Sequence, residues 1–304
     1  MVLPPAPERS IRLGKGEKAG RKKEAIVTAV YTQAPRVRTP EQVIGSLFDP
    51  VRKSKEERKE ERSSISRPVN KQLWATLEGK ASALAFTAEQ AKKQEGPHIL
   101  QRIALTDGSE ALQDRVKEAF PDAEMVLDFI HVDEYLWKLA NALLGETSPE
   151  RTAWVRDRAL LLMLGQTSTV VAEFREMASD PERTSAQRDI ARQVAAYYER
   201  NQDWMKYDQY LALGWPIATG VIEGACRHLV KDRCERSGMR WTQDGAEALL
   251  RLRSVAENGD WKRFHAYRRE ERHREVYGVT APNSVATIGE LTRPDLSRPL
   301  CLAA

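Results

Sequence analysis

The sequence has few cysteines and no long apolar run. Only three of its 304 residues are cysteine, Cys226, Cys234 and Cys301, and none of them forms a Cys-x-x-Cys pair. This odd number without metal-site spacing argues against a disulfide framework and against a structural zinc site. No segment approaches the roughly 20 apolar residues that cross a bilayer, and the N-terminus lacks the apolar core of a secretory signal. We therefore expect a cytoplasmic protein with no membrane partner.

The charge of the chain is small in total but unevenly distributed. The net charge is +4, from 48 Lys and Arg against 44 Asp and Glu. Residues 133–213 hold ten Lys and Arg against thirteen Asp and Glu, so the remainder carries +7. Residues 1–23 hold seven positive and two negative side chains, and residues 261–275 are again rich in Arg and Lys. Basic segments suggest a polyanionic partner such as nucleic acid, although solvated surfaces explain many such runs equally well.

The residue pattern of the first half predicts strands and helices in alternation. Residues 25–32 are β-branched and aromatic and predict a strand, which a loop through Pro35 and Pro40 follows. We expect residues 68–91 to be helical, with Trp74 and Leu77 on one side. The other predicted elements are strands at 99–105 and 125–130, with a helix between them that carries Leu112, Val116 and Phe120 and is capped by Ser109. Two strands joined by a helix predict a parallel βαβ crossover.

From Asp133 onward the pattern becomes predominantly helical. Apolar residues recur at helical spacing through residues 133–144, 154–164 and 170–177, and a long helical segment is expected at 187–213. Gly220 then opens a predicted helix, and Thr242 is placed to cap another. In the first of these helices Ile222, Cys226 and Leu229 share one face.

Three acidic residues stand out by their local context. Asp107 follows an apolar strand, at the strand end where open α/β sheets place their ligands. Asp128 interrupts the second predicted strand, and a carboxylate in an apolar run needs a partner or a role. Glu223 precedes Arg227 and Lys231 at spacings of four. A carboxylate beside aligned cations can hold a metal while the cations contact phosphates.

Each of these residues also has an ordinary explanation. Asp-Gly is a common turn dipeptide, which accounts for Asp107 without a ligand. Asp128 can pair with a buried Arg or accept backbone hydrogen bonds, and His131 can be a satisfied core histidine. Glu223 and Arg227 can be a simple i, i+4 pair on a helix surface. The residue patterns alone leave both sets of explanations open.

Several motifs in the chain resemble the ISKra-type bacterial insertion-sequence transposases. The longest is GVIEGACRHLVKDR at 220–233, and it is followed by SGMRW at 237–241. Shorter ones are LTDG at 105–108 and LDFIHVDEYLW at 127–137, with further similarity at 14–18, 29–32 and 38–42. The resemblance covers the chain from Leu13 to Trp261. The long motif around Glu223 is far more specific than the short Asp-Gly one.

The resemblance implies a DDE transposase with a ribonuclease H-like fold. In such enzymes two Asp and one Glu hold a pair of divalent ions, Mg²⁺ or Mn²⁺, which flank the scissile phosphodiester. By this resemblance Asp107 matches the second Asp and Glu223 matches the Glu, with Asp128 and His131 as supporting residues near the site. The implied fold is α/β, a mixed ribonuclease H-like sheet interrupted by a large all-helical insertion. The implied organisation is a basic arm at 1–23, the first part of the core at 24–132, the insertion at 133–213, the final Glu helix and C-terminal helices at 214–277 and an irregular tail at 278–304.

Double-stranded DNA, as transposon ends and target, is the partner that the resemblance implies, together with a homo-oligomer acting on paired ends. The expected phosphate or DNA-end contacts are Arg227, His228, Lys231, Arg233 and Arg240. Trp241 could stack on a base, although core packing is the commoner role for such a tryptophan.

The chain departs from the family pattern at the first Asp. In the family this residue lies on the first strand, ahead of the segment that corresponds to residues 1–23, whereas this chain has no Asp before Asp49, which lies in a Phe-Asp-Pro loop. We therefore expect a truncated transposase that lacks the first strand and its carboxylate. One alternative is a non-catalytic DNA-binding remnant that binds element ends or the full-length enzyme. A more distant alternative is a sugar hydrolase with Asp107 and Glu223 as its acid–base pair.

Overall fold

The computed structural model of the protein describes residues 23–49, 67–235 and 241–278. Most of the predicted basic arm, Arg240 and the predicted tail beyond Gly278 lie outside these residues. The strands are β1 (Ile26–Thr32), β2 (Val69–Thr76), β3 (Ile103–Thr106) and β4 (Glu124–Leu127). The helices before residue 215 are α1 (Pro40–Phe48), α3 (Lys80–Gln94), α4 (Glu110–Ala119), α5 (Phe129–Leu144), α6 (Glu150–Met163), α7 (Thr167–Ser179), α8 (Ser185–Asn201), the 3-10 turn η1 (Gln202–Trp204) and α9 (Tyr207–Ala212). Those after it are α10 (Gly220–Ala225), the π-helix η2 (Cys226–Lys231), α11 (Asp232–Cys234), α12 (Gln243–Glu257) and α13 (Trp261–Tyr277).

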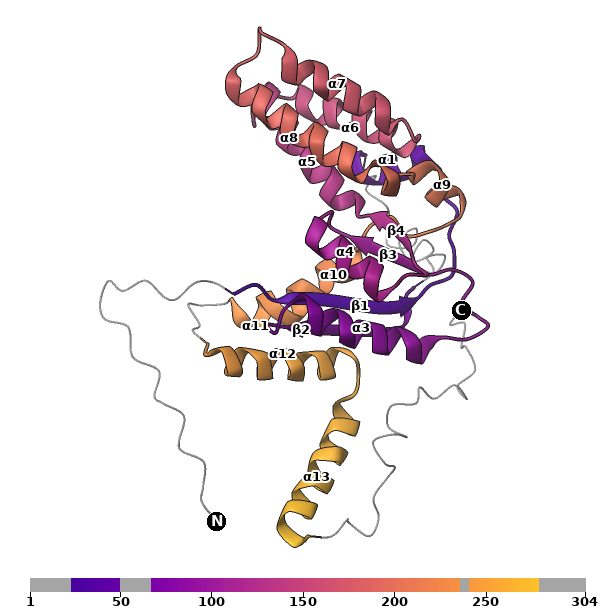
Figure 1. Cartoon of the computed structure of the whole chain (residues 1–304), viewed down its shortest axis with the longest axis vertical. Helices are drawn as coiled ribbons and strands as arrows, with labels where there is room; N and C mark the ends of the chain where they lie inside the picture. Colours follow the sequence, from indigo (N-terminus) through magenta and orange to yellow (C-terminus); the bar gives the residue numbers. More distant parts are fainter. Residues whose placement is uncertain (1–22, 50–66, 236–240, 279–304) are drawn as a thin grey trace, which may run out of the picture. The chain divides into compact units, whose positions relative to one another are not determined.

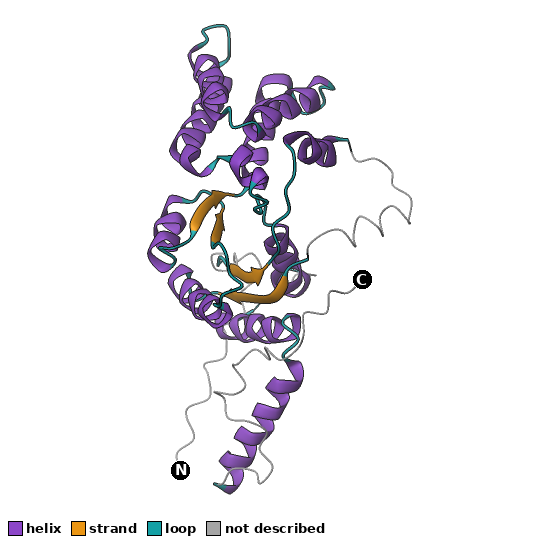
Figure 2. Cartoon of the chain, turned by 90° about the vertical axis from the view of Figure 1, so that its right-hand side faces the viewer, coloured by secondary structure: helices purple, strands orange, loops and turns teal. Residues whose placement is uncertain are grey.

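The predicted α/β class is confirmed, with helices far more abundant than strands. The strands form two sheets of two, β1 with β2 and β3 with β4, drawn in orange in Figure 2. The chain divides into two compact units. The first draws its described residues from Met1–Ala29, Gln72–Thr87 and Ile222–Arg293, and the second from Val30–Lys71 and Ala88–Val221. In the part of the chain that the structure describes, no helix is long and apolar enough to cross a lipid bilayer.

The predicted βαβ crossover is present in the second unit. Strands β3 and β4 are parallel, with Ile103 opposite Glu124 and Thr106 opposite Leu127, and α4 connects them. The strand predicted at 99–105 begins only at Ile103, because Leu100 is 85% exposed and contributes nothing to the core. Helix α4 starts after Ser109 as predicted, but the Ser109 side chain makes no capping hydrogen bond.

The interpretation of Asp128 as a residue inside a strand is wrong. Strand β4 ends at Leu127, and Asp128 is the N-cap of α5, since its Oδ1 accepts a hydrogen bond from the Ile130 amide at 2.9 Å. The apolar residues on both sides of Asp128 are buried, in the strand before it and in the helix after it. The sequence pattern therefore does not mark the boundary between β4 and α5. Asp128 is 2% exposed, and its second carboxylate oxygen accepts a hydrogen bond from the Thr219 hydroxyl.

The predominantly helical block predicted at 133–213 is confirmed, although its first helix starts earlier, at Phe129. Helices α5, α6, α7 and α8 lie alongside one another (Figure 1) and enclose a core that includes Leu139, Leu162, Phe174 and Val194. The long segment expected at 187–213 is divided, because α8 ends at Asn201 and α9 begins only at Tyr207.

Helix α1 occupies the segment expected to be a loop through Pro40. Thr39 and Gln42 form a complete capping box, in which the Thr39 hydroxyl accepts from the Gln42 amide and the Gln42 side chain accepts from the Thr39 amide. Pro40 occupies the first helical position, where its missing N–H costs nothing. This Thr-Pro-Glu-Gln pattern is a standard helix start, so the helix was predictable.

The predicted helix at 68–91 is wrong in its first half. Residues Val69–Thr76 form β2, Gly79 follows with a left-handed φ of +96°, and only then does α3 begin. Side chains of α12 and of its C-cap residue, Asn258, bind this strand and the residue after it. The Asn258 amide group accepts from the Leu73 N–H at 2.8 Å and donates to its carbonyl at 3.0 Å. The Glu247 carboxylate accepts from the Thr76 hydroxyl at 2.9 Å and the Leu77 amide at 2.7 Å.

Gly220 opens a helix as predicted, but the helix changes type after one turn. The residues 226–231 form a π-helix, whose i→i+5 hydrogen bonds widen each turn. The buried positions are Ala225 and Leu229, whereas Cys226 of the predicted face is a half-buried free thiol. Spacings of four from Glu223 through Arg227 to Lys231 therefore no longer align these side chains as they would on an α-helix. The predicted capping of α12 by Thr242 is confirmed by its bond from the Gly245 amide at 3.1 Å.

The two helix N-caps of the βαβ unit give a matched stability test. We expect Asp128→Ala to lower the free energy of unfolding by about 2 kcal/mol, because it removes a buried cap and leaves the Thr219 hydroxyl without its partner. Ser109→Ala should cost about 0.5 kcal/mol or less, since Ser109 makes no capping bond. Urea unfolding of both variants measures the difference, and equal costs would contradict the assigned role of Asp128.

The half-buried carboxyl of Asp133 predicts a pH dependence of stability. Burial raises the pKa of Asp133 to about 6, from an ordinary value of 3.8, although a hydrogen bond from the Trp137 indole opposes this at 3.0 Å. The folded state therefore binds the Asp133 proton more tightly than the unfolded state does. The stabilisation that comes from this proton is complete below pH 4 and is lost as the pH rises through 6. We expect Asp133→Asn to match the parent protein at pH 4 and to exceed it by about 1 kcal/mol at pH 7.5, after allowance for partial exposure. Thermal unfolding across this range, with the exposed Asp157→Asn as control, tests the expectation.

Candidate functional site

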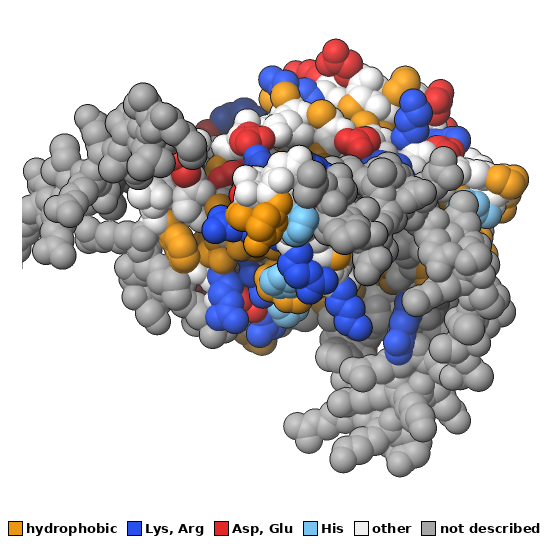
Figure 3. Space-filling model, turned by 90° about the horizontal axis from the view of Figure 1, so that it is seen from below, with side chains coloured by type: hydrophobic (Ala, Val, Ile, Leu, Met, Phe, Trp, Pro, Cys, Tyr) orange, Lys and Arg blue, Asp and Glu red, His pale blue; other side chains and the backbone are white. Residues whose placement is uncertain are grey.

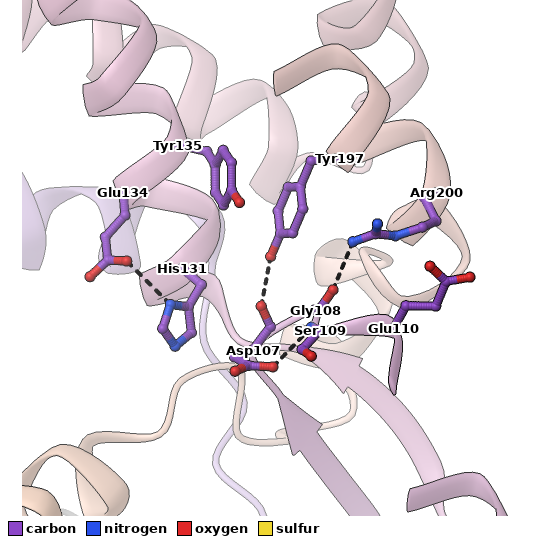
Figure 4. Close-up of a pocket in the computed structure, with 9 residues that line it drawn as sticks. All are labelled: Asp107, Gly108, Ser109, Glu110, His131, Glu134, Tyr135, Tyr197 and Arg200. Carbon is purple, nitrogen blue, oxygen red and sulfur yellow. Dashed lines mark hydrogen bonds and ion pairs between the residues drawn. The ribbon is translucent and has the colours of Figure 1, made fainter. Parts of the chain in front are cut away.

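The carboxyl end of β3 opens into a pocket of about 430 Å³ in the second unit (Figure 4). Nine residues line it: Asp107, Gly108, Ser109, Glu110, His131, Glu134, Tyr135, Tyr197 and Arg200. They come from the turn after β3 and from helices α4, α5 and α8. The pocket therefore brings together two of the residues singled out in the sequence, Asp107 and His131, with side chains from distant parts of the chain.

The turn that carries Asp107 is fixed mainly through its backbone. The Tyr197 hydroxyl donates to the Asp107 carbonyl at 2.9 Å, and the Arg200 guanidinium donates to the Gly108 carbonyl at 2.8 Å. One Asp107 carboxylate oxygen accepts from the Ser109 amide at 2.9 Å, which forms a local turn. The other oxygen makes no hydrogen bond with a described residue. The Asp107 side chain is exposed, so this oxygen is available to a ligand in the pocket.

Gly108 is required at its position by both conformation and space. Its φ is +79°, in the left-handed region that favours glycine. A Cβ atom there would lie 2.8 Å from Cε2 of Tyr197 and 2.9 Å from Cδ1 of Leu127. The absence of a side chain thus lets α8 approach the turn closely enough for Tyr197 to bond the backbone of Asp107.

Tyr197 is held by aromatic stacking and remains a proton donor. Its ring stacks on that of Tyr135 with centroids 4.0 Å apart and planes at 12°. Burial, followed by the nearby Tyr135 and Asp107, raises the pKa of Tyr197 far above its ordinary range. The hydroxyl therefore keeps its proton and serves to position the turn.

His131 and Glu134 lie on the α5 side of the pocket. The His131 Nδ1 atom is 3.2 Å from a carboxylate oxygen of Glu134, one helical turn away, and the His131 side chain is partly exposed. His131 is thus not a satisfied core histidine. Asp128 differs from it, because both carboxylate oxygens of Asp128 accept hydrogen bonds in the interior, and its observed contacts are structural.

The remaining predicted site residues belong to the first unit. Glu223 lies exposed in α10, and none of the described residues forms an ion pair with it. Arg227, His228, Lys231 and Arg233 are all exposed, with the His228 ring 3.4 Å from the Asp232 carboxylate. Trp241 is 44% exposed, which fits a stacking role better than core packing, and Arg240 lies outside the described residues.

Asp107 is the one predicted metal ligand whose pocket the structure defines. Its free carboxylate oxygen is a hard donor of the kind that Mg²⁺ prefers. Across residues 23–49, 67–235 and 241–278, however, no three His, Cys, Asp or Glu side chains are grouped so that they could hold a metal ion. Asp107 thus fits one ligand position, and a complete ligand set would need further groups.

The residues that shape this pocket cannot all be recognised in the sequence. Tyr197 and Arg200 lie about 90 residues beyond Asp107, and nothing local marks them as its partners. Glu134 was detectable, because it follows His131 at the i, i+3 spacing that joins side chains on a helix. Comparison with protein-family models, with curated proteins and with solved structures finds no match to this chain.

The glycines of the second unit offer a direct test of the turn. Gly108→Ala should cost about 2–4 kcal/mol of unfolding free energy, because strain from φ adds to a collision with Tyr197. Gly145→Ala should cost only about 1 kcal/mol, since Gly145 has a similar φ of +84° but open space around its Cα. Chemical denaturation of both variants separates the cost of the left-handed φ from the cost of the collision with Tyr197. Equal losses would mean that Tyr197 does not pack against the turn as described.

Proposed function

We propose that this protein is the catalytic region of a DDE transposase, which cleaves DNA at insertion-sequence ends and transfers the strands in the cytoplasm. The resemblance of residues 105–108, 127–137 and 220–233 to ISKra-type transposases is the origin of the proposal. The observation that supports it best is the Asp107 carboxylate, exposed at the carboxyl end of a strand in a parallel pair, with one oxygen free. Open α/β sheets bind their ligands at such strand ends.

In this proposal Asp107 and Glu223 are the carboxylates that hold Mg²⁺ or Mn²⁺. A bound divalent ion would supply charge stabilisation for the phosphodiester oxygens and would lower the pKa of an attacking water or hydroxyl. The residues of the protein itself position the Asp107 carboxylate. Tyr197 and Arg200 fix the turn, so that the Asp107 side chain does not need to be ordered when substrate binds.

His131 is a candidate for holding a proton near the substrate. It lines the same pocket as Asp107, is partly exposed and has Glu134 at 3.2 Å to orient its ring. A His–carboxylate pair of this kind fixes the ring tautomer and can exchange a proton with a nearby hydroxyl. Arg227, His228, Lys231 and Arg233 would contact the DNA backbone in the proposal, and paired ends would be handled by a homo-oligomer.

Cleavage by isosteric variants tests the proposal. With Mg²⁺ or Mn²⁺ and a duplex taken from the DNA on either side of the gene, we expect Asp107→Asn to lower the nicking rate by about 100-fold or more, since it removes one negative ligand but keeps the turn acceptor. Glu223→Gln should have a similar effect. Glu110→Gln, which changes the charge of the same pocket at a residue with no assigned role, should leave the rate within about threefold.

Two outcomes would contradict the proposal. Undiminished nicking by Asp107→Asn would show that Asp107 is not a catalytic residue. DNA binding by the parent protein without nicking under either metal ion would instead favour the non-catalytic remnant, which binds element ends or the intact enzyme. Circular dichroism of each variant keeps loss of folding separate from loss of chemistry.

A further inference from the structure

Helix α13 is a long helix against which few of the described residues pack. None of the residues in Trp261–Tyr277 is buried, so the helix gains little from hydrophobic contact. Ion pairs along its own surface stabilise it. Arg263 lies 3.0 Å from Asp260, and Arg274 contacts both Glu270 and Glu271. A helix that is solvated on all sides and built in this way is expected either to bridge parts of a protein or to bind a partner.

The charges of α13 are sorted to opposite sides. Lys262, His265, Arg269 and Arg272 recur at spacings of three and four, which puts them in one row along the helix, here named the basic stripe. All four are exposed. Figure 3, seen from below, looks nearly along α13 from its C-terminal end and shows Lys, Arg and His side chains (blue and pale blue) together with hydrophobic ones (orange) there.

Two of the three acidic residues of α13 neutralise the other side of the helix, and the third, Glu275, lies 4.0 Å from Arg272 at the end of the basic stripe. Glu270 and Glu271 are half-buried and pair with Arg274, away from the basic stripe. Among the described residues, neither Lys262 nor Arg269 has an acidic partner within ion-pair distance. A row of exposed cations in which Lys262 and Arg269 carry no counter-charge is the electrostatic footprint of a polyanion-binding surface.

We propose that the basic stripe of α13 binds double-stranded DNA by lying along the major groove or its phosphate walls. The diameter of an α-helix with its side chains, about 10–12 Å, matches the roughly 12 Å width of that groove. From Lys262 to Arg272 the stripe rises about 15 Å, enough to follow about four base pairs. This surface is separate from the Asp107 pocket, and its binding does not depend on the proposed cleavage.

Other polyanions fit the helix less well. A membrane-surface helix needs an apolar face opposite its cations, whereas Glu270, Glu271 and Arg274 occupy that side. Single-stranded nucleic acid is usually bound by several aromatic side chains on which successive bases stack, whereas the exposed Trp261, 4.8 Å from the His265 ring of the stripe, lies at one end of the helix. The major groove of duplex RNA is too narrow and deep to admit a helix. Duplex DNA is the polyanion that remains.

The test compares two double variants of the full chain with the same change in net charge. Lys262→Gln with Arg269→Gln removes the two stripe cations that have no acidic partner, whereas Arg263→Gln with Arg274→Gln removes two cations from the opposite side of the same helix. Binding is measured by fluorescence anisotropy with a labelled duplex of about 30 base pairs over a series of salt concentrations. The stripe variant should bind at least about tenfold more weakly, and its log–log salt slope should be less steep by about 1.8, from two lost phosphate contacts.

The opposite-side variant should keep the salt slope of the parent protein, and Lys262→Arg with Arg269→Lys, which preserves both charges, should keep its affinity. Equal weakening by both neutralised variants would overturn the proposal, because net charge alone would then explain the binding. So would unchanged binding by the stripe variant, or an equally tight and equally sensitive interaction with duplex RNA or anionic vesicles. Asp107→Asn should bind normally, so loss of cleavage and loss of this surface are distinguishable.

Discussion

The junction between β4 and α5 is the constraint on which the second unit depends. There the backbone N–H of Asp128 donates to the Thr106 carbonyl at 2.9 Å, and its carboxylate accepts from the Ile130 amide and the Thr219 hydroxyl. Burying a charge is costly unless hydrogen bonds replace its hydration, and here both carboxylate oxygens have donors. One residue, through its backbone and its side chain, thereby joins the end of β3, the start of α5 and the segment that leads to α10. The position of Asp107, the residue after Thr106, follows from this junction.

Tyrosine hydroxyls from the helical block also satisfy buried polar groups near this junction. Three of them donate to a backbone carbonyl in β4 or next to β3, and the fourth donates to a carbonyl of α5. The pairs are Tyr197 with Asp107, Tyr198 with Val132, Tyr207 with Leu127 and Tyr210 with Met125. Burial raises the pKa of all four tyrosines, so these groups remain donors. The helices therefore complete the hydrogen bonding of a sheet that is only two strands wide, and they make the turn at Asp107 rigid.

The sequence predicted what depends on neighbouring residues and missed what depends on distant ones. The strand β1, the βαβ crossover and the cap of α12 at Thr242 follow from local composition and spacing, and all three are present. Strand β2 was mistaken for helix because its first residues are polar and its hydrogen-bond partners, such as Asn258, lie far along the chain. The same holds for the candidate site. Asp107 can be recognised from the apolar strand directly before it, whereas no neighbouring residue marks Tyr197 as its partner.

The charges of the Asp107 pocket bear on how DNA would be held. Its lining contains the carboxylates of Asp107, Glu110 and Glu134 against the single guanidinium of Arg200, which is already bonded to the Gly108 carbonyl. Such a pocket repels a phosphate until a cation neutralises it, so it is poorly suited to supply affinity by itself. Affinity for DNA would then have to come from other surfaces, and the basic side chains that lack acidic partners are the groups able to provide it. Much of the charge of the helical block is balanced internally by pairs such as Arg158 with Glu173 and Arg175 with Glu199. In the proposed function, Asp107 and Glu223 would serve the chemistry, and the unpaired cations would serve attachment to DNA.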